Sequence, residues 1–195
     1  MSFGMSQFEE DSTAWDSMFQ RYQEEQNAHR RKEFLIALTF IRNKETLQRL
    51  LDDLNPWLDL QDQPARSSQK HRISKQDKIL FLKYLSRNAV DGASRVWMFL
   101  RDNWANMVAS YGLYSTQLGE ITREVVQNYA NNRARLEEVK IFFTDNPLNN
   151  GAGDRARGLA LESIENRIQW LLKYPASIAE ALVAEKLSTK GKLDE

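Results

Sequence analysis

The stretch VWMFLRDNWANMVASYG, residues 96–112, decides the fold of this chain. It contains two of the five tryptophans, Trp97 and Trp104, which stand seven positions apart. Its large apolar residues recur at steps of three and four positions, the spacing that places side chains on one face of an α-helix. This apolar stripe consists of Trp97, Leu100, Trp104, Met107, Val108 and Tyr111. The stretch therefore predicts a helix with one continuous apolar face.

The stripe also bears on whether these aromatic residues form a binding site. Burial of a large ring contributes roughly 1.5–3 kcal/mol to folding. The periodic placement therefore favours core packing over a ligand site or a stacking platform for nucleic acid. We expect one helix over about 93–111, with both indoles in the core. Asn103 would be a buried or edge polar link, and Gly112 a left-handed cap.

The same helical period recurs along nearly the whole chain, and no stretch alternates with the period of a strand. Glycine (8) and proline (4) are scarce, which favours long helices. The sequence predicts an all-α fold of about nine helices in antiparallel pairs, an α-solenoid of the HEAT/armadillo kind, with a closed helix bundle as the alternative architecture. The expected helices cover about 6–25, 29–43, 44–54, 74–88, 93–111, 115–130, 135–146, 154–174 and 176–187.

The expected domain organisation is simple. We expect a single helical-repeat domain over 6–187, interrupted by a polar loop at 61–73 that contains QDQPARSSQKHR. Residues 1–5 and 188–195 are expected to be disordered. Ser74 and Asp77 have the spacing of a capping box after that loop.

Composition excludes several classes of function. Lys+Arg and Asp+Glu both number 27, and this balance argues against nucleic-acid binding. The chain has no cysteine and only two histidines, so disulfides, thiolate metal sites and multi-histidine metal sites are excluded. It has no signal peptide pattern, no apolar stretch long enough for a membrane span and no Asn-x-Ser/Thr site. These features favour a reducing compartment such as the cytoplasm.

The known catalytic motifs are missing as well. The chain contains no H-E-x-x-H, G-x-S-x-G or nucleotide-binding glycine motif. His29 and His71 lie in polar, basic surroundings, where a solvated surface role is favoured over general-base catalysis. Glu162 and Glu165 share a helix face, but the nearby Arg155, Arg157 and Arg167 make ordinary ion pairing the better interpretation. No catalytic or metal-binding residue is predicted.

Two basic clusters are candidate contacts for an acidic partner or a peptide carboxylate. The candidates are Arg30, Arg31, Lys70 and Arg72. Solvated helix and loop positions are the favoured alternative for all four.

Several segments together resemble, in order, the C-terminal helical domain of the aminopeptidase-N-like zinc aminopeptidases. The segments are RNAVDGASRVWMFLRDNWANMVASYG, LEEVKIFF and RARGLALESIENRIQWL, and SKQD at 74–77 is similar to a short R-x-Q-D segment of that family. The matching positions include Asn88, Gly92, Trp97, Phe99, Leu100, Asn103, Trp104, Tyr111, Gly112, Glu138, Val139, Phe142, Phe143, Ala160, Leu161, Glu162, Ile164, Ile168 and Trp170. Ser74 replaces a usual arginine, and Arg167 replaces a frequent asparagine.

The resemblance implies a context rather than a reaction. In that family the zinc ligands and the substrate loop lie in a separate catalytic domain, and the helical C-terminal domain caps the peptide chamber. This chain would then have no cofactor of its own, with zinc only in the complete aminopeptidase, and would be inactive alone. Its partners would be the catalytic domain or a peptide substrate, with a homodimer also possible. The parent enzyme could be membrane-anchored or lumenal.

Three functions are compared on this basis. The first is a non-catalytic C-terminal domain or fragment of a zinc aminopeptidase that supports N-terminal trimming of peptides. The second is a free-standing helical-repeat interaction module derived from that domain, and the third, an independent enzyme, is disfavoured by the missing motifs. A truncated repeat array exposes an apolar end, so we also expect the isolated chain to self-associate or to be marginally stable.

Overall fold

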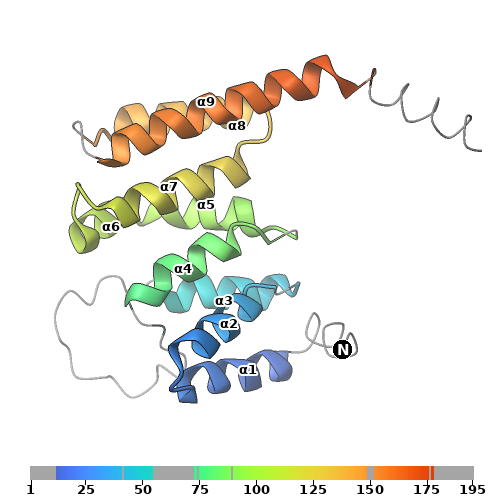
Figure 1. The fold of residues 1–195 in the computed structure, drawn as a ribbon, viewed down its shortest axis with the longest axis vertical. Helices are drawn as coiled ribbons and strands as arrows, with labels where there is room; N and C mark the ends of the chain where they lie inside the picture. The colour runs from blue at the N-terminus through green and yellow to red at the C-terminus, as the bar shows by residue number, and fades with distance from the viewer. Residues whose placement is uncertain are drawn as a thin grey trace, which may run out of the picture.

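The computed structural model describes residues 12–40, 42–54, 73, 75–88, 90–148, 152–175 and 177. Within these residues the chain forms nine α-helices and no strand (Figure 1). The prediction of an all-α fold is therefore confirmed. The helices are α1 (Ser12–Glu24), α2 (Ala28–Leu38), α3 (Lys44–Leu54), α4 (Lys75–Leu85), α5 (Gly92–Asp102), α6 (Trp104–Tyr111), α7 (Thr116–Tyr129), α8 (Arg133–Asp145) and α9 (Ala152–Lys173).

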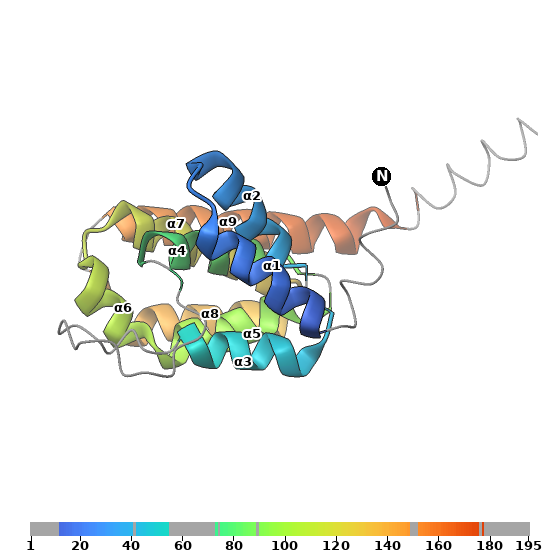
Figure 2. The same ribbon diagram turned by 90° about the horizontal axis from the view of Figure 1, so that it is seen from below.

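The helices stack in two rows. α2, α4, α7 and α9 follow one another in one row, and α3, α5 and α8 form the other (Figures 1 and 2). Direct contacts join the successive helices of the first row, and α1 packs on α2 at one end while α8 packs on α9 at the other. A cluster of buried apolar residues runs through the stack from Trp15 in α1 to Ile168 in α9. This arrangement is consistent with the predicted α-solenoid.

Local sequence explains where several helices begin. A helix leaves its first backbone N–H groups without partners, and a short polar side chain can accept hydrogen bonds from them. Asn27, Asn43, Ser115 and Asn132 do so at the starts of α2, α3, α7 and α8. The helix predicted over 44–54 therefore coincides with α3.

The helix predicted over 93–111 is instead two helices, and this prediction is wrong. The chain breaks at Asn103, between α5 and α6, where φ is −106° and ψ is 11°. Its side-chain Nδ2 donates to the carbonyl of Phe99 at 2.9 Å, and asparagine competes in this way with regular helix geometry. The apolar stripe survives the break, because Trp97, Leu100 and Met107 have no exposed surface. Asn103 is a buried polar link, as expected.

The end of α6 differs in detail from the expected cap. Gly112 has a φ of 83°, a conformation that favours glycine, and its N–H donates to the carbonyl of Val108 at 2.8 Å. Its ψ of 147° lies far from the left-handed helical region. The positive φ is confirmed, whereas a left-handed helical cap is not what forms.

Gly92 allows a close approach between helices. A Cβ atom at this position would lie 2.1 Å from the carbonyl oxygen of Leu85, the last residue of α4. No side chain fits at that distance, so α5 can begin against the end of α4 only with glycine here. Gly92 is one of the positions that match the family resemblance, and the structure supplies the physical reason for glycine there.

Some expected features lie outside the described residues. All of the last expected helix, 176–187, lies outside them except Ser177. Ser74 of the expected capping box and the polar stretch 61–72 also lie outside them. The count of about nine helices is still met within the described part, because the expected helix at 93–111 became two.

Candidate functional site

The carboxylate of Glu138 in α8 is a polar group that contacts two other helices. Trp97 Nε1 and Arg101 Nη1 of α5 donate to its Oε1 at 2.9 and 2.7 Å. The Tyr129 hydroxyl, at the end of α7, donates to its Oε2 at 2.5 Å. Glu138 therefore joins three helices through charge-assisted hydrogen bonds, which are stronger than neutral ones.

The electrostatics of this cluster keep Glu138 ionised. Burial alone would raise its pKa, but the hydrogen bonds from Tyr129 and Trp97 and the charge of Arg101 hold the pKa of Glu138 below its ordinary value. Burial and the adjacent carboxylate raise the pKa of Tyr129 to about 12. A carboxylate whose oxygens already accept three hydrogen bonds links helices structurally and is a poor general base.

Arg157 forms a second cluster at the junction of α6, α8 and α9. Its guanidinium lies 4.7 Å from the ring centroid of Trp104 and 4.3 Å from that of Phe143. Nη1 donates to the carbonyl of Asn146 at 2.5 Å, whereas Nε and Nη2 are buried and have no hydrogen-bond partner among the described residues. Burial lowers the pKa of Arg157 to about 10 against the raising effect of Asp154, so it stays protonated at neutral pH.

The sequence interpretation of Arg157 is wrong. It was expected to take part in exposed ion pairing near Glu162 and Glu165, yet it is only 3% exposed. Its spacing of three and seven residues from buried Ala160 and Ile164 was the signal that could have placed it on the inward face of α9. Glu165 pairs instead with Lys140 of α8, at 2.7 Å.

The aromatic residues of the sequence resemblance meet between these two clusters. Phe142 packs edge-on against both Trp97 and Trp104, with centroid distances of 5.2 and 5.7 Å. Trp97 also stacks on Tyr129 at 5.3 Å. The expectation that both indoles of the opening stretch lie in the core is confirmed, since Trp97 has no exposed surface and Trp104 is buried.

Asn88, which matches the resemblance, and Arg167, which departs from it, each donate hydrogen bonds to the end of another helix. Asn88 Nδ2 donates to the carbonyl of Thr39, just beyond α2, at 2.8 Å. Arg167 donates to the carbonyls of Gln127 and Ala130, at 2.8 and 2.7 Å, and so satisfies acceptors at the end of α7. Leu100, Phe99 and Ile168 are buried, and Tyr111 and Phe143 are partly buried against the core.

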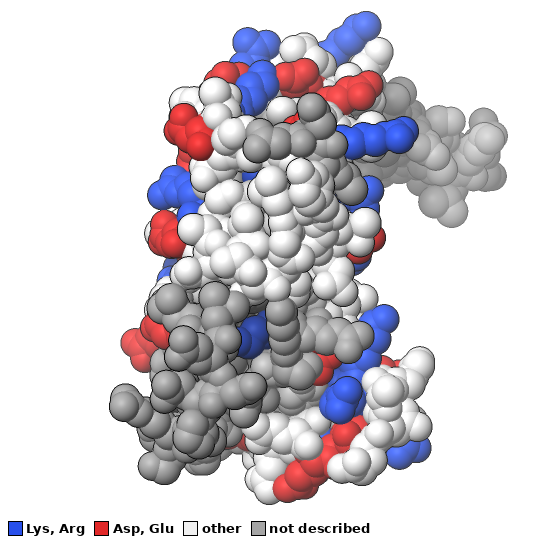
Figure 3. Space-filling view, turned by 90° about the vertical axis from the view of Figure 1, so that its left-hand side faces the viewer, with Lys and Arg blue, Asp and Glu red and all other residues white. Residues whose placement is uncertain are grey.

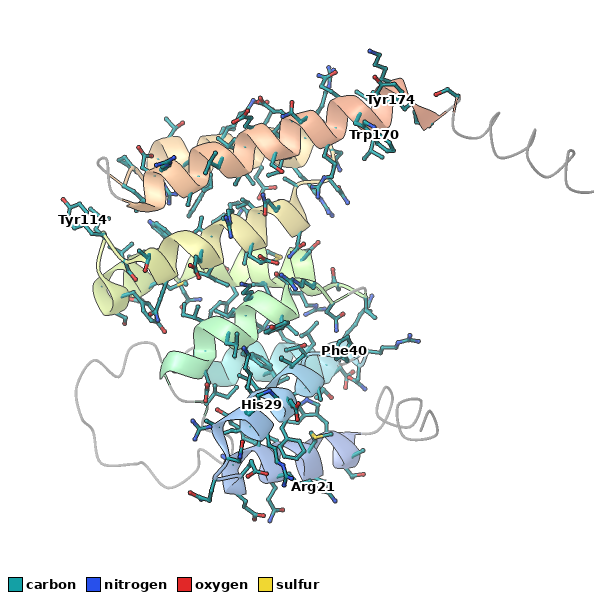
Figure 4. All side chains as sticks on the ribbon, viewed as in Figure 1. Arg21, His29, Phe40, Tyr114, Trp170 and Tyr174 are labelled. Carbon is teal, nitrogen blue, oxygen red and sulfur yellow. The ribbon has the colours of Figure 1, made fainter. Side chains whose placement is uncertain are left out.

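Three residues of the resemblance are exposed, Gly112, Glu162 and Trp170. Trp170 is 51% exposed and its ring centroid lies 5.9 Å from that of Tyr174 (Figure 4). The C-terminal end of α9 reaches beyond α7 and α8, so no helix of the described part covers it (Figure 1). Periodicity alone could not show that the neighbours of α9 end earlier.

Of the four predicted peptide contacts, only Arg30 and Arg31 lie among the described residues, so the expected grouping stays a prediction. Arg30 and Arg31 are exposed on α2, and Arg31 Nε lies 3.9 Å from Asp77 Oδ2. Lys70 and Arg72 lie outside the described residues, as does His71. His29 is exposed and its Nδ1 lies 3.3 Å from Glu33 (Figure 4). This geometry resembles a solvated helix surface.

The donor set of the described residues does not fit a zinc ion. Zinc sites in proteins use cysteine, histidine and carboxylate ligands gathered around one point. The described residues hold no group of three or more such side chains, and the whole chain has two histidines and no cysteine. Over the same described residues, no helix is long and apolar enough to cross a membrane.

These features define a class of protein: an all-helical domain of two stacked rows, held together by buried aromatic rings, a buried arginine and a partly exposed carboxylate. The chain belongs to the family of the ERAP1-like C-terminal domain, whose family model matches residues 2–166. The resemblance predicted from the sequence is thereby confirmed.

Named relatives agree with the family model. The chain is 31% identical over 173 residues to endoplasmic reticulum aminopeptidase 1 of Homo sapiens, which covers 89% of this chain and 17% of that protein. It is 30% identical over 178 residues to aminopeptidase A of Gloydius brevicauda, covering 91% and 17%. It is 28% identical over 159 residues to glutamyl aminopeptidase of Bos taurus, covering 82% and 15%. The chain thus spans less than a fifth of the length of these relatives.

Proposed function

We propose that this chain acts as the non-catalytic C-terminal helical domain of a zinc aminopeptidase, where it caps the peptide chamber and supports N-terminal trimming of peptides. The observation that carries the proposal is the family match over residues 2–166, together with relatives that are all named as aminopeptidases. The zinc ion would belong to the catalytic domain; the described residues of this chain hold no group of three or more possible zinc ligands.

The contacts among helices α5 to α9 support a structural role for this domain in bounding the peptide chamber. Glu138 joins α5, α7 and α8, and Arg157 joins α6, α8 and α9, so these helices are held as one unit. A domain that bounds a chamber must keep its shape when it meets a substrate or another domain. Contacts made within the domain serve that purpose, and they engage the Glu138 carboxylate through three hydrogen bonds.

A free-standing interaction module is the second candidate. The observation that favours it is the buried cluster that runs from Trp15 to Ile168, which gives the described part a core of its own. An in-frame H-E-x-x-H in the genomic sequence upstream of Met1 favours the aminopeptidase domain. A promoter and start site directly upstream favour the module.

The proposal is tested by mixing the chain with human endoplasmic reticulum aminopeptidase 1 produced without the region that this chain matches, called here the ERAP1 remainder. The remainder must first show a folded circular dichroism spectrum. The chain is expected to bind the remainder and to increase its trimming of peptides. Alone, the purified chain is expected not to hydrolyse aminoacyl-7-amido-4-methylcoumarin substrates. Zinc-dependent turnover that copurifies with the chain would contradict the proposal, as would a failure to bind a folded remainder.

A further inference from the structure

One segment of the chain carries no charge at all. Residues Asn103–Gly119 contain no Lys, Arg, Asp or Glu over 17 positions, although 28% of the chain is charged. The next longest uncharged runs, such as 34–41 and 125–132, have eight. The segment covers the whole of α6, the connection after it and the first residues of α7.

This segment forms one face of the molecule. Figure 3 shows a broad surface with no charged side chain on it, and Lys, Arg, Asp and Glu lie around its edges. Tyr114 projects on this side, at the opposite side of the stack from Phe40 (Figure 4), and is 69% exposed. We call this face the uncharged α6–α7 surface; its exposed residues are Ala105, Ala109, Gly112, Tyr114, Thr116 and Gln117.

Core packing does not explain the missing charge. The inward side of the segment is already formed by buried Trp104, Met107 and Leu118. Outward helix positions in soluble proteins usually carry charged residues. The neighbouring surface of α8 and α9 follows that rule, because Lys140 Nζ of α8 lies 2.7 Å from Glu165 Oε1 of α9. The small and uncharged residues of α6 are therefore a property of its outer face.

We propose that the uncharged α6–α7 surface is the face through which this domain docks on the remainder of an aminopeptidase, with Tyr114 as its central contact. The centres of protein interfaces are depleted of charged residues and enriched in tyrosine. A tyrosine surrounded by small residues is a typical anchor, since its ring fills a pocket in the partner while small neighbours let the two surfaces approach.

The choice of partner rests on the proposed function and on two observations. The chain covers only 15–17% of its named relatives, so most of each relative lies outside the matched region and can contact this domain. The surface also has no charge with which to recognise an acidic or basic ligand. Nucleic acid and anionic membranes are bound chiefly through Lys and Arg, and this face has neither.

The test uses the full chain and the ERAP1 remainder defined above. Tyr114→Glu and Ala109→Glu each place a charge on the uncharged α6–α7 surface. Phe40→Glu is the matched control, because Phe40 is also an exposed aromatic residue, at 58%, on the opposite side of the stack. All variants should keep the circular dichroism spectrum and melting temperature of the wild type. Binding is measured by calorimetry, and hydrogen exchange locates the surface that becomes protected.

The expected result separates this proposal from the proposed function. Wild type and Phe40→Glu should bind alike, whereas the two surface variants should bind at least about tenfold more weakly, because an unpaired charge is then buried in the interface. Residues 104–117 should become protected on binding. Equal binding by Tyr114→Glu and Ala109→Glu would overturn the surface assignment and leave the proposed function standing. No binding by the wild type to a folded remainder would overturn both, and protection of 104–117 by a second copy of this chain instead would overturn the choice of partner.

Discussion

Glu138 and Arg157 hold the same end of the helix stack, yet their surroundings differ. The Glu138 carboxylate accepts hydrogen bonds from three side chains on α5 and α7 and keeps 37% of its side chain exposed. The Arg157 residue is 3% exposed and is held mainly by two aromatic rings, with a single hydrogen bond to a backbone carbonyl.

The difference indicates how each side chain contributes to the stability of the fold. The contribution of Glu138 lies in its acceptor atoms, so a side chain of the same shape with a weaker acceptor should lose stability. The contribution of Arg157 lies in the volume and stacking of its side chain, because two of its donors are unpaired. An apolar side chain of similar length should therefore be tolerated at Arg157 and not at Glu138.

The largest effect is expected from removing the buried ring of Trp97, which contacts both Glu138 and Phe142. Trp97→Ala deletes a fully buried indole, its stacking on Tyr129, its contact with Phe142 and its hydrogen bond to Glu138. The expected loss in unfolding free energy is about 3–5 kcal/mol, measured by urea denaturation. Trp170→Ala is the control, because Trp170 is 51% exposed and should cost far less. Equal losses for the two variants would mean that the indole cluster is not the centre of the core.

Arg157 sharpens the comparison directly. Arg157→Ala should cost about 2–4 kcal/mol, because it leaves a cavity between the rings of Trp104 and Phe143. Arg157→Met keeps the length of the side chain and removes the two unpaired donors, so it should lie within about 1.5 kcal/mol of the wild type. Both values come from urea denaturation monitored by circular dichroism. A loss with methionine as large as with alanine would show that the charge itself is what holds this junction.

Glu138 should behave in the opposite way. Glu138→Gln keeps the shape but replaces one acceptor oxygen by a donor, so the expected loss at neutral pH is about 1–2 kcal/mol. Because the pKa of Glu138 is lower in the folded state, its contribution is present above the unfolded-state pKa, near 4.5, and is lost as the pH falls through the folded-state pKa. Stability measured from neutral pH to below 4 should therefore fall more steeply for the wild type than for Glu138→Gln. Parallel curves would exclude this carboxylate as a source of acid sensitivity.

The smallest effect is expected from the basic pair on α2. Arg30→Ala and Arg31→Ala should each change the unfolding free energy by less than about 0.5 kcal/mol, because both side chains are exposed. The 3.9 Å contact of Arg31 with Asp77 is long for an ion pair and is open to solvent. These two variants give the baseline against which the Glu138 and Arg157 effects are judged. A loss above about 1 kcal/mol in either would show that this exposed surface is more tightly organised than its geometry indicates.

The comparison also shows which features could be predicted. Helix α3 was predicted over its full range, 44–54, because its leucines recur with a helical period. The cap at Asn43 was not predicted and is seen only in the structure. The indole core of α5 was predicted for the same reason, since its period is local. The break at Asn103 was missed, because asparagine is compatible with a helix unless its side chain bonds the carbonyl of Phe99.

The contacts around Glu138 and Arg157 could not be predicted from the sequence. Trp97 and Glu138 are 41 positions apart, and Trp104 and Arg157 are further still, so their meeting depends on how α8 and α9 stack on α5 and α6. Arg157 and Arg155 both lie near the start of α9 and have the same charge, yet only Arg157 is buried. Which of them enters the core is set by the rotation of α9 about its axis.

The sequence by itself determined the all-α class, the family and most helix positions, because hydrophobic period, capping residues and motif order act over short distances along the chain. Only the tertiary structure decided that Arg157 is buried, that Trp170 is exposed and that the uncharged residues 103–119 include a continuous outer face. The physical reason is that burial depends on how neighbouring helices are placed: the rotation of α9 about its axis decides the burial of Arg157, and the earlier ends of α7 and α8 leave Trp170 exposed.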